Sequence, residues 1–153
     1  MTPINEAVDE DVETQSDPHE TPTEPSPDDA PPLLTDQLTA WVRHQPQCEQ
    51  VAVAALIEED ELLAREWVRR LLVAEHDDGG ISCDWLAFEA RYTRAPGLTP
   101  ADKAFLRLIV AVRFPRNVSR WNLEQLDERR LCIVLRAMAK LAGSDTVAVG
   151  TRV

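Results

Sequence analysis

The sequence predicts an all-α protein, a small irregular bundle of about five to seven helices preceded by a disordered, acidic, proline-rich N-terminal tail. Apolar residues recur at helical spacing through residues 33–143, and helix-start and helix-end signals separate the periodic stretches. Residues 1–32 lack the apolar content of a core. We therefore expect a tail over 1–32, one α-helical domain over 33–143 and a flexible C-terminal tail over 144–153.

Residues 1–32 have the composition of a disordered segment. They contain ten acidic residues, seven of the eleven prolines, no lysine or arginine and no aromatic residue. Such a segment buries too little apolar surface to offset the entropy that is lost on ordering. We expect the fold to begin after it.

The net charge of −11 is distributed unevenly. Residues 33–90 hold 12 acidic and 4 basic residues, whereas residues 91–153 hold 5 acidic and 12 basic residues. Three interpretations stay open. The two halves pack together with complementary charge and the tail only aids solubility; the basic half contacts nucleic acid and the tail competes for that surface; or the tail itself binds a basic partner.

The N-terminal half of the domain is predicted to be helical. Thr35 is expected to cap a helix that ends near His44, because Pro46 follows. Residues 47–76 contain neither glycine nor proline, and we expect two helices that meet near residues 58–60, with one long bent helix as the alternative. The second of these helices carries an apolar stripe that we assign to the core: Leu63, Trp67, Leu71 and Ala74.

The stretch HDDGGISCDW, residues 76–85, is predicted to connect two helices. It resembles the middle of an EF-hand calcium loop, but neither register supplies the glutamate that closes such a loop, so calcium is set aside. Gly79 or Gly80 is expected to end one helix, and Ser82 is expected to cap the next. An aromatic stripe that we assign to the core follows: Trp85, Phe88 and Tyr92.

Residues 99–114 carry the clearest helix signal. Thr99 as the cap, Pro100 at the first helical position and Asp102 two residues later match the start of a helix. The continuation KAFLRLIVAVRF is apolar on nearly every face, as in a helix surrounded by others. We expect it to be the central helix of the core.

Two more helices are expected after Pro115. A short one follows Ser119, and a last one runs from about Asp127 to Leu141 and ends at Gly143. Spacing assigns the following residues to the inward face of the last helix: Leu131, Val134 or Leu135, Met138 and Leu141.

Basic residues of the C-terminal half are candidates for a partner-binding surface beside a tryptophan. Arginine and tryptophan on one surface suit phosphate contact and base stacking, and equally a hot spot for a protein partner. A solvated helix face is the alternative. The candidate residues are Arg113, Arg116, Arg120, Trp121, Arg129, Arg136 and Lys140.

The three cysteines, Cys48, Cys83 and Cys132, are expected to be free and mostly buried thiols. The alternative, a zinc site with histidines 44 and 76, lacks the tight ligand pairs that structural zinc sites use. We predict neither a metal nor a cofactor.

Catalytic signatures are missing from the sequence. It contains no GxxxxGK[ST], GxGxxG, HExxH or GxSxG pattern, so phosphate-loop, dinucleotide, metalloprotease and nucleophile-elbow chemistries lack their motifs. The acidic run 58–61 is expected to start a helix and face water rather than bind metal. An enzyme of unrecognised type stays as an alternative.

These observations predict a non-enzymatic helical protein-interaction module, an accessory or regulatory factor. A nucleic-acid-associated protein that uses the basic C-terminal half, with the acidic tail competing for it, is the alternative. The longest apolar stretch is far shorter than a membrane span, and the N-terminal residues have neither the basic start nor the apolar stretch of a secretory signal. We therefore expect a cytoplasmic protein with a protein partner and no membrane association.

Overall fold

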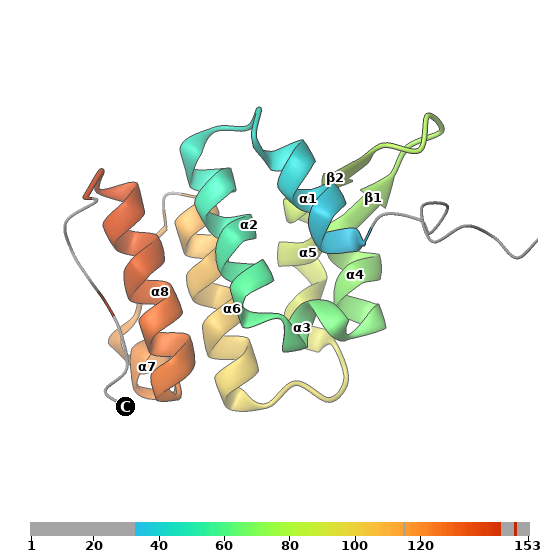
Figure 1. Ribbon diagram of the computed structural model, residues 1–153. Coiled ribbons are helices and arrows are strands. Elements are labelled where there is room, and N and C mark those ends of the chain that lie inside the picture. Colours follow the sequence, from blue (N-terminus) through green and yellow to red (C-terminus); the bar gives the residue numbers. More distant parts are fainter. Residues whose placement is uncertain (1–32, 115, 145–148, 150–153) are drawn as a thin grey trace, which may run out of the picture. The chain divides into compact units, whose positions relative to one another are not determined.

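Three helices form the centre of the fold: α2 (Gln47–Glu59), α6 (Pro100–Arg113) and α8 (Glu128–Leu141). The computed structural model describes residues 33–114, 116–144 and 149, so the predicted tail over 1–32 and most of the predicted tail over 144–153 lie outside the described residues. Each of the three helices packs against the other two, and they lie side by side in Figure 1. Their buried apolar residues include Leu56, Phe105, Leu106, Ile109 and Ile133.

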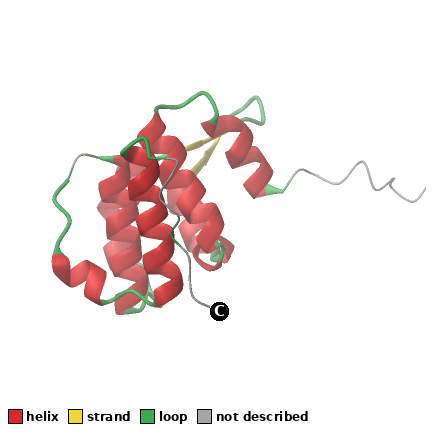
Figure 2. Ribbon diagram, turned by 60° about the vertical axis from the view of Figure 1, so that its left-hand side comes forward, coloured by secondary structure: helices red, strands yellow, loops and turns green. Residues whose placement is uncertain are grey.

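The remaining helices surround this centre. Helix α1 (Leu34–Val42) packs on α2, α7 (Arg120–Glu124) packs on α6, and α4 (Glu66–Leu72) packs on α5 (Trp85–Arg91). A 3-10 turn over Tyr92–Arg94 continues α5. Figure 2 shows that the described chain is helical apart from one short hairpin and the loops. The predicted helical bundle is therefore confirmed.

The prediction of the central helix rests on local chemistry and is confirmed. The Thr99 hydroxyl accepts from the Asp102 N–H at 3.1 Å, and the Asp102 carboxylate accepts from the Thr99 N–H at 2.9 Å. This reciprocal capping box satisfies two N–H groups that a helix start otherwise leaves unpaired. The aromatic stripe is also in the core, where Phe88 stacks on Tyr92 and meets Trp85 edge to face.

The chain from Gln47 onward does not form one bent helix. Helix α2 ends at Glu59, and α3 (Glu61–Ala64) begins two residues later. Asp60 between them has a φ of +60°, a conformation that turns the chain sharply and is uncommon for residues other than glycine. The predicted junction near residues 58–60 is confirmed.

The predicted helix over residues 61–76 is wrong in two places. The chain becomes extended at Arg65, which separates α3 from α4, and this break accounts for a helix more than expected. The Arg65 side chain reaches the Gly97 carbonyl and the Asp102 carboxylate at 3.2 and 3.1 Å, so contacts distant in sequence stabilise the break. As a result Leu62, Val68 and Leu72 are fully buried, while Trp67 and Leu71 of the predicted stripe are half-buried.

The second error concerns the stretch HDDGGISCDW, which does lie between two helices, α4 and α5, but holds the turn and the second strand of a β-hairpin. Strands β1 (Val73–Glu75) and β2 (Ile81–Cys83) pair in antiparallel fashion, with Ala74 opposite Ser82. Gly79 has a φ of +79°, and the Asp78 carboxylate accepts from the Gly80 N–H at 2.9 Å. Both features are typical of a tight turn. The helix cap is Asp84, not Ser82, because the Asp84 side chain accepts from the Ala87 N–H at 2.9 Å.

Two smaller predictions also need correction. Helix α1 begins at Leu34 with no side-chain cap, so Thr35 lies inside the helix. Part of the predicted face of α8 is confirmed, because Val134 is buried and Leu141 packs against the core. The rest is wrong, because Leu135 and Met138 are exposed and Leu131 is half-buried, while Arg130, Ile133 and Ala137 are buried.

The three cysteines are free, with Cys132 buried and Cys48 and Cys83 half-buried. Burial and the negative charge of Glu49 outweigh the charge of Arg113 and raise the pKa of Cys83 to about 12, so this thiol stays protonated at neutral pH. In the part of the chain that the structure describes, each helix is too short or too polar to cross a membrane.

Candidate functional site

Helix α7 places Trp121 at the surface. Its neighbours in sequence fix the helix to the fold, since Asn122 is buried and Leu123 packs against the core. The indole of Trp121 therefore points outward and is 49% exposed. A large aromatic side chain that is half in water offers apolar area that a partner can cover.

The exposed indole borders a hollow of about 260 Å³ between α6 and α7. Its lining consists of Leu98, Pro100, Lys103, Arg107 and Trp121, which we call the Trp121 hollow. The capping box fixes Pro100 at the first turn of α6, and Lys103 and Arg107 are four residues apart on one side of that helix. Rigid elements therefore hold both the apolar walls and the two cations.

The charge in this hollow is positive and is not neutralised by a neighbouring carboxylate. No acidic residue lines the hollow, and Lys103 has no ion pair with any residue in the described ranges. The guanidinium of Arg107 lies beside the Tyr92 hydroxyl. The hollow thus combines an apolar wall with two positive charges.

Three of the seven predicted surface residues lie together on the segment that follows α6. Arg116 pairs with both oxygens of Glu89 at 3.0 Å, and Arg120 pairs with Glu124 at 2.6 Å within α7. The Arg120 side chain is 91% exposed, so this pair opens readily to a competing anion. Both arginines are thus paired with carboxylates of the same chain, close in sequence to the exposed Trp121.

Arg113 does not contribute to this region. Its Nη2 lies 3.1 Å from Glu49 Oε2, and its Nη1 lies 3.8 Å from Cys48 Sγ, so it is paired with α2. The same Glu49 carboxylate accepts from the Trp85 indole at 2.9 Å. Arg113 is six residues after Arg107, which on a helix is a different face.

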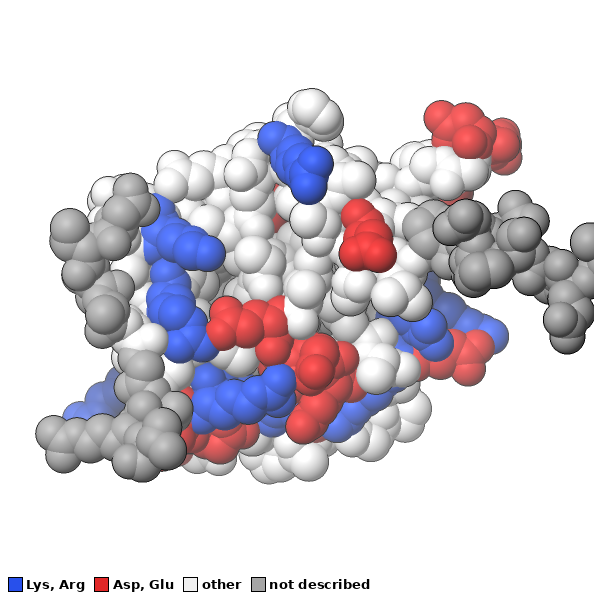
Figure 3. Space-filling model, viewed as in Figure 1, with Lys and Arg blue, Asp and Glu red and all other residues white. Residues whose placement is uncertain are grey.

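The three remaining candidates are on α8, where Arg129 and Arg136 face the acidic end of α2 and Lys140 lies near its first residue. Arg129 donates to the carbonyls of residues 58 and 59 and to the Asp60 carboxylate, and Arg136 pairs with Glu58. The amide of Gln47 donates to the Lys140 carbonyl at 2.8 Å. Figure 3 shows acidic and basic side chains next to one another over the face formed by α2, α3 and α8. The charges of Arg129 and Arg136 are therefore balanced within the fold.

Sequence reasoning missed Lys103, Arg107 and Leu98. The sequence predicts the helix over residues 99–114 at the centre of the core. Lys103 and Arg107, four residues apart on that helix, indicate that one of its faces reaches water. This spacing was the available signal. Because the other faces of α6 carry buried apolar residues, such as Phe105, Leu106 and Ile109, the overall pattern of the helix indicates burial on every side.

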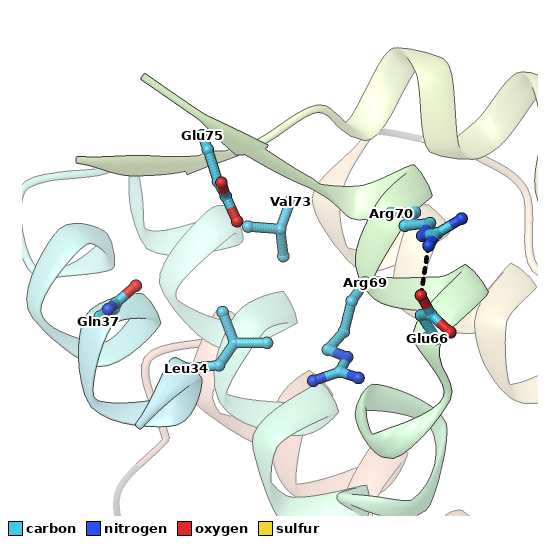
Figure 4. A pocket seen from close by; sticks show the side chains of 7 residues that line it. All are labelled: Leu34, Gln37, Glu66, Arg69, Arg70, Val73 and Glu75. Carbon is cyan, nitrogen blue, oxygen red and sulfur yellow. Dashed lines mark hydrogen bonds and ion pairs between the residues drawn. The ribbon is translucent and has the colours of Figure 1, made fainter. Parts of the chain in front are cut away.

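A larger hollow, of about 580 Å³, lies elsewhere, between α1, α4 and β1 (Figure 4). Leu34 and Gln37 line it from α1, Glu66, Arg69 and Arg70 from α4, and Val73 and Glu75 from β1. Glu66 is ion-paired with Arg70, and Glu75 and Arg69 add one charge of each sign. Because the lining holds two acids and two arginines, this hollow favours no ligand charge.

A buried cluster of charges joins the helices but offers no open site. Arg130 contacts the carboxylates of Glu59 and Asp102, and both acids are almost completely buried. Burial alone raises the pKa of Asp102, but hydrogen bonds from Thr99 and the charges of Arg130 and Arg65 outweigh it and hold that pKa below its ordinary value. All three charges thus serve the packing of the helices.

The hairpin brings a histidine next to a serine. The Ser82 hydroxyl and His76 Nε2 are 2.9 Å apart across the exposed strands. Neither residue lines any hollow described above, and the described residues contain no cluster of three or more histidine, cysteine, aspartate or glutamate side chains arranged for a metal. We assign no chemistry to this pair.

Comparison with protein-family models, curated proteins and solved structures finds no match for this chain. The function is therefore argued from the surface alone. The Trp121 hollow is the candidate because it combines an exposed aromatic side chain with uncompensated charge of one sign.

Proposed function

We propose that the protein is a non-enzymatic helical interaction module that uses the Trp121 hollow to bind a protein segment carrying acidic and bulky apolar side chains. One observation supports this above the others. A half-exposed indole adjoins two cations in a hollow without an acidic residue. Tryptophan and cationic side chains around a concave surface are typical of the few residues that dominate binding at protein interfaces.

The size of the hollow fits one side chain better than a cofactor. Pockets for cofactors and drug-sized ligands are about 300–1,000 Å³ and enclose most of the ligand. The Trp121 hollow, at about 260 Å³, is smaller than that range. Leu98, Pro100 and Trp121 supply apolar walls, so a phenylalanine or leucine side chain of the partner is the expected occupant.

The positive charge of the hollow favours a partner with acidic residues next to its apolar side chain. Lys103 and Arg107 line the wall of the hollow. Carboxylates beside the apolar anchor gain charge-assisted hydrogen bonds and are attracted over long range. Lysine or arginine at the same positions is repelled.

A protein segment suits the described charges better than nucleic acid does. Nucleic-acid affinity depends on many simultaneous phosphate contacts, which displace counterions. Arg113, Arg129 and Arg136 are already held by carboxylates of the same chain. A phosphate backbone has to compete with these ion pairs, whereas a short acidic segment needs only the cations of the hollow.

Binding of synthetic peptides to the full chain tests this proposal. The main probe is an amidated, fluorescein-labelled peptide with glutamates around a single phenylalanine, here called the acidic aromatic peptide. Two control probes replace phenylalanine by alanine or glutamates by lysines. We expect saturable binding of the acidic aromatic peptide and at least about tenfold weaker binding of both controls.

Trp121→Ala is the matched variant, and Leu135→Ala is its control. Leu135 is also an exposed apolar residue, but it lies on α8. We expect Trp121→Ala to weaken the binding of the acidic aromatic peptide by about 10- to 30-fold, and Leu135→Ala to leave it unchanged. The proposal is wrong if both variants bind like the parent chain. Steeply salt-dependent retention of DNA or RNA, without peptide binding, favours the nucleic-acid alternative.

A further inference from the structure

A second hollow adjoins the Trp121 hollow and shares Arg107 with it. It has a volume of about 200 Å³ and is lined from three sides: by α6, by Glu89 and Tyr92, and by residues 116–118 with Asn122. Arg107 and Ala111 lie one turn apart on the face of α6 that also carries Lys103. Arg107 therefore belongs to the lining of both hollows.

Asn122 brings an unpaired amide to the second hollow. The residue is only 7% exposed, and its side-chain Oδ1 is buried without a hydrogen-bond partner among the described residues. A buried polar atom without a partner is costly, and such atoms are rare in folded proteins. Because Oδ1 only accepts, a carboxylate can pair with Asn122 only through the Nδ2 amino group of the same amide.

Two further donors line the same space. The Arg107 guanidinium lies beside the Tyr92 hydroxyl, and both residues line the hollow. The only carboxylate in the lining is Glu89, and both of its oxygens are held at 3.0 Å by Arg116. With Glu89 neutralised by Arg116, the positive charge of Arg107 sets the polarity of the hollow.

We infer that this second hollow is a carboxylate pocket that binds an aspartate or glutamate side chain of the same segment whose apolar side chain enters the Trp121 hollow. The carboxylate accepts from Arg107, Tyr92 and the amino group of Asn122. The inference rests on the proposed function and deepens it. It makes recognition a two-point match, in which one apolar residue and one acidic residue at a fixed spacing are bound on either side of Arg107.

A carboxylate pocket differs from general charge attraction because it favours an acidic side chain at one position of the peptide. In the test, each glutamate of the acidic aromatic peptide is replaced in turn by glutamine, which keeps the shape and removes the charge. We expect one replacement to weaken binding to the full chain by about tenfold, and the others to weaken it by about twofold or less. If every replacement weakens binding equally, the pocket is refuted and only diffuse attraction remains.

Variants of the lining then identify the hollow. Tyr92→Phe removes one hydroxyl and keeps the ring that stacks on Phe88, and Asn122→Leu removes the amide at nearly constant volume. In both variants we expect the tenfold penalty at the selected position to shrink to about twofold, while peptides with glutamine there bind as before. Leu135→Ala keeps the full penalty. Tyr92→Phe keeps the test decisive if Asn122→Leu fails to fold. A penalty unchanged in Tyr92→Phe and in every folded variant overturns the inference.

The outcomes separate this inference from the proposed function. If none of the peptides binds, the proposed function fails and the carboxylate pocket fails with it. If all of them bind through Trp121 without positional preference, the proposed function stands and the pocket is overturned. A further peptide carries a free carboxylate at its C-terminus and no glutamate. Tight binding of that peptide, suppressed by Asn122→Leu, overturns the side-chain source in favour of a terminal carboxylate.

Discussion

Arg130 of α8 places its Nε and Nη2 at 3.0 and 2.7 Å from the same carboxylate oxygen of Glu59 in α2. Nη2 also lies 2.8 Å from Asp102 Oδ1 in α6, so one guanidinium joins the three central helices. The second oxygen of Glu59 accepts from the Leu62 N–H at 2.8 Å, which fixes the start of α3. The acidic and basic halves of the chain therefore meet in the interior as well as on the surface.

Removing the guanidinium is expected to destabilise the fold strongly. Arg130→Met keeps much of the volume but leaves Glu59 buried without its cation and Asp102 with Arg65 alone. Uncompensated buried charge costs about 3–5 kcal/mol of unfolding free energy. Urea unfolding followed by circular dichroism measures the difference. Arg120→Met makes the same exchange in an exposed pair and is expected to cost about 0–1 kcal/mol. Equal effects of the two substitutions would contradict the role of Arg130.

The stability of the protein is expected to fall in acid partly because of Asp102. The pKa of this carboxyl is lower in the folded than in the unfolded chain, so its contribution is fully present above the unfolded pKa. It is lost as the pH falls from about 5 through the folded pKa. In Asp102→Asn, unfolding free energy measured across this range is expected to decline less steeply than in the parent chain. An identical slope for both proteins argues against the assignment.

The helix cap at Asp84 gives a direct test of the hairpin. Asp84→Ala removes the acceptor for the Ala87 N–H and is expected to cost about 1 kcal/mol. Ser82 lies within β2, so Ser82→Ala is expected to change the unfolding free energy by no more than about 0.5 kcal/mol. Thermal or urea unfolding measures the loss of unfolding free energy in both variants and shows which residue caps the helix. A larger effect at Ser82 supports a helix that starts there, as the sequence pattern indicates.

The fold is expected to be independent of residues 1–32. The buried apolar core begins at Leu38 and extends to Ala137. A chain that starts at residue 33 is therefore expected to unfold with a free energy within about 0.5 kcal/mol of the full chain. Urea unfolding of both chains measures this. A loss well above that value contradicts the prediction that the N-terminal segment contributes nothing to the core.

Local signals were predictable from the sequence, and long-range choices were not. The capping box of Thr99 and Asp102 spans three residues, so its pattern is sufficient to place the start of α6. Residues 73–75, Val-Ala-Glu, are compatible with helix or strand, and their cross-strand pairing with residues 81–83 together with the contact of β2 with α1 decides for strand. No pattern within a single segment contains that information.

The face of α8 illustrates the same limit. Leu131, Leu135 and Met138 form one apolar stripe, and Val134 and Ala137 belong to another. The structure turns the second stripe inward because Arg130 on that side pairs with Glu59. A buried ion pair between residues 71 positions apart cannot be read from helical spacing.

The candidate site was partly predictable for a related reason. Trp121, Arg116 and Arg120 are neighbours in sequence, and a surface patch that includes them could be proposed from composition alone. The sequence also groups Arg129 and Arg136 with them, but in the structure Arg129 pairs with Asp60 and Arg136 pairs with Glu58. Lys103 and Arg107 join the site only through the packing of α7 on α6.

Mapping of amide and indole NMR shifts on the full chain, during titration with the acidic aromatic peptide, tests the central claim most directly. The account predicts that the largest shifts fall on the Trp121 indole and on the amides of Lys103, Arg107 and Asn122, while Leu34 and Arg69 at the hollow between α1, α4 and β1 stay unchanged. Absence of any shift at Trp121, or shifts confined to Leu34 and Arg69, would contradict it.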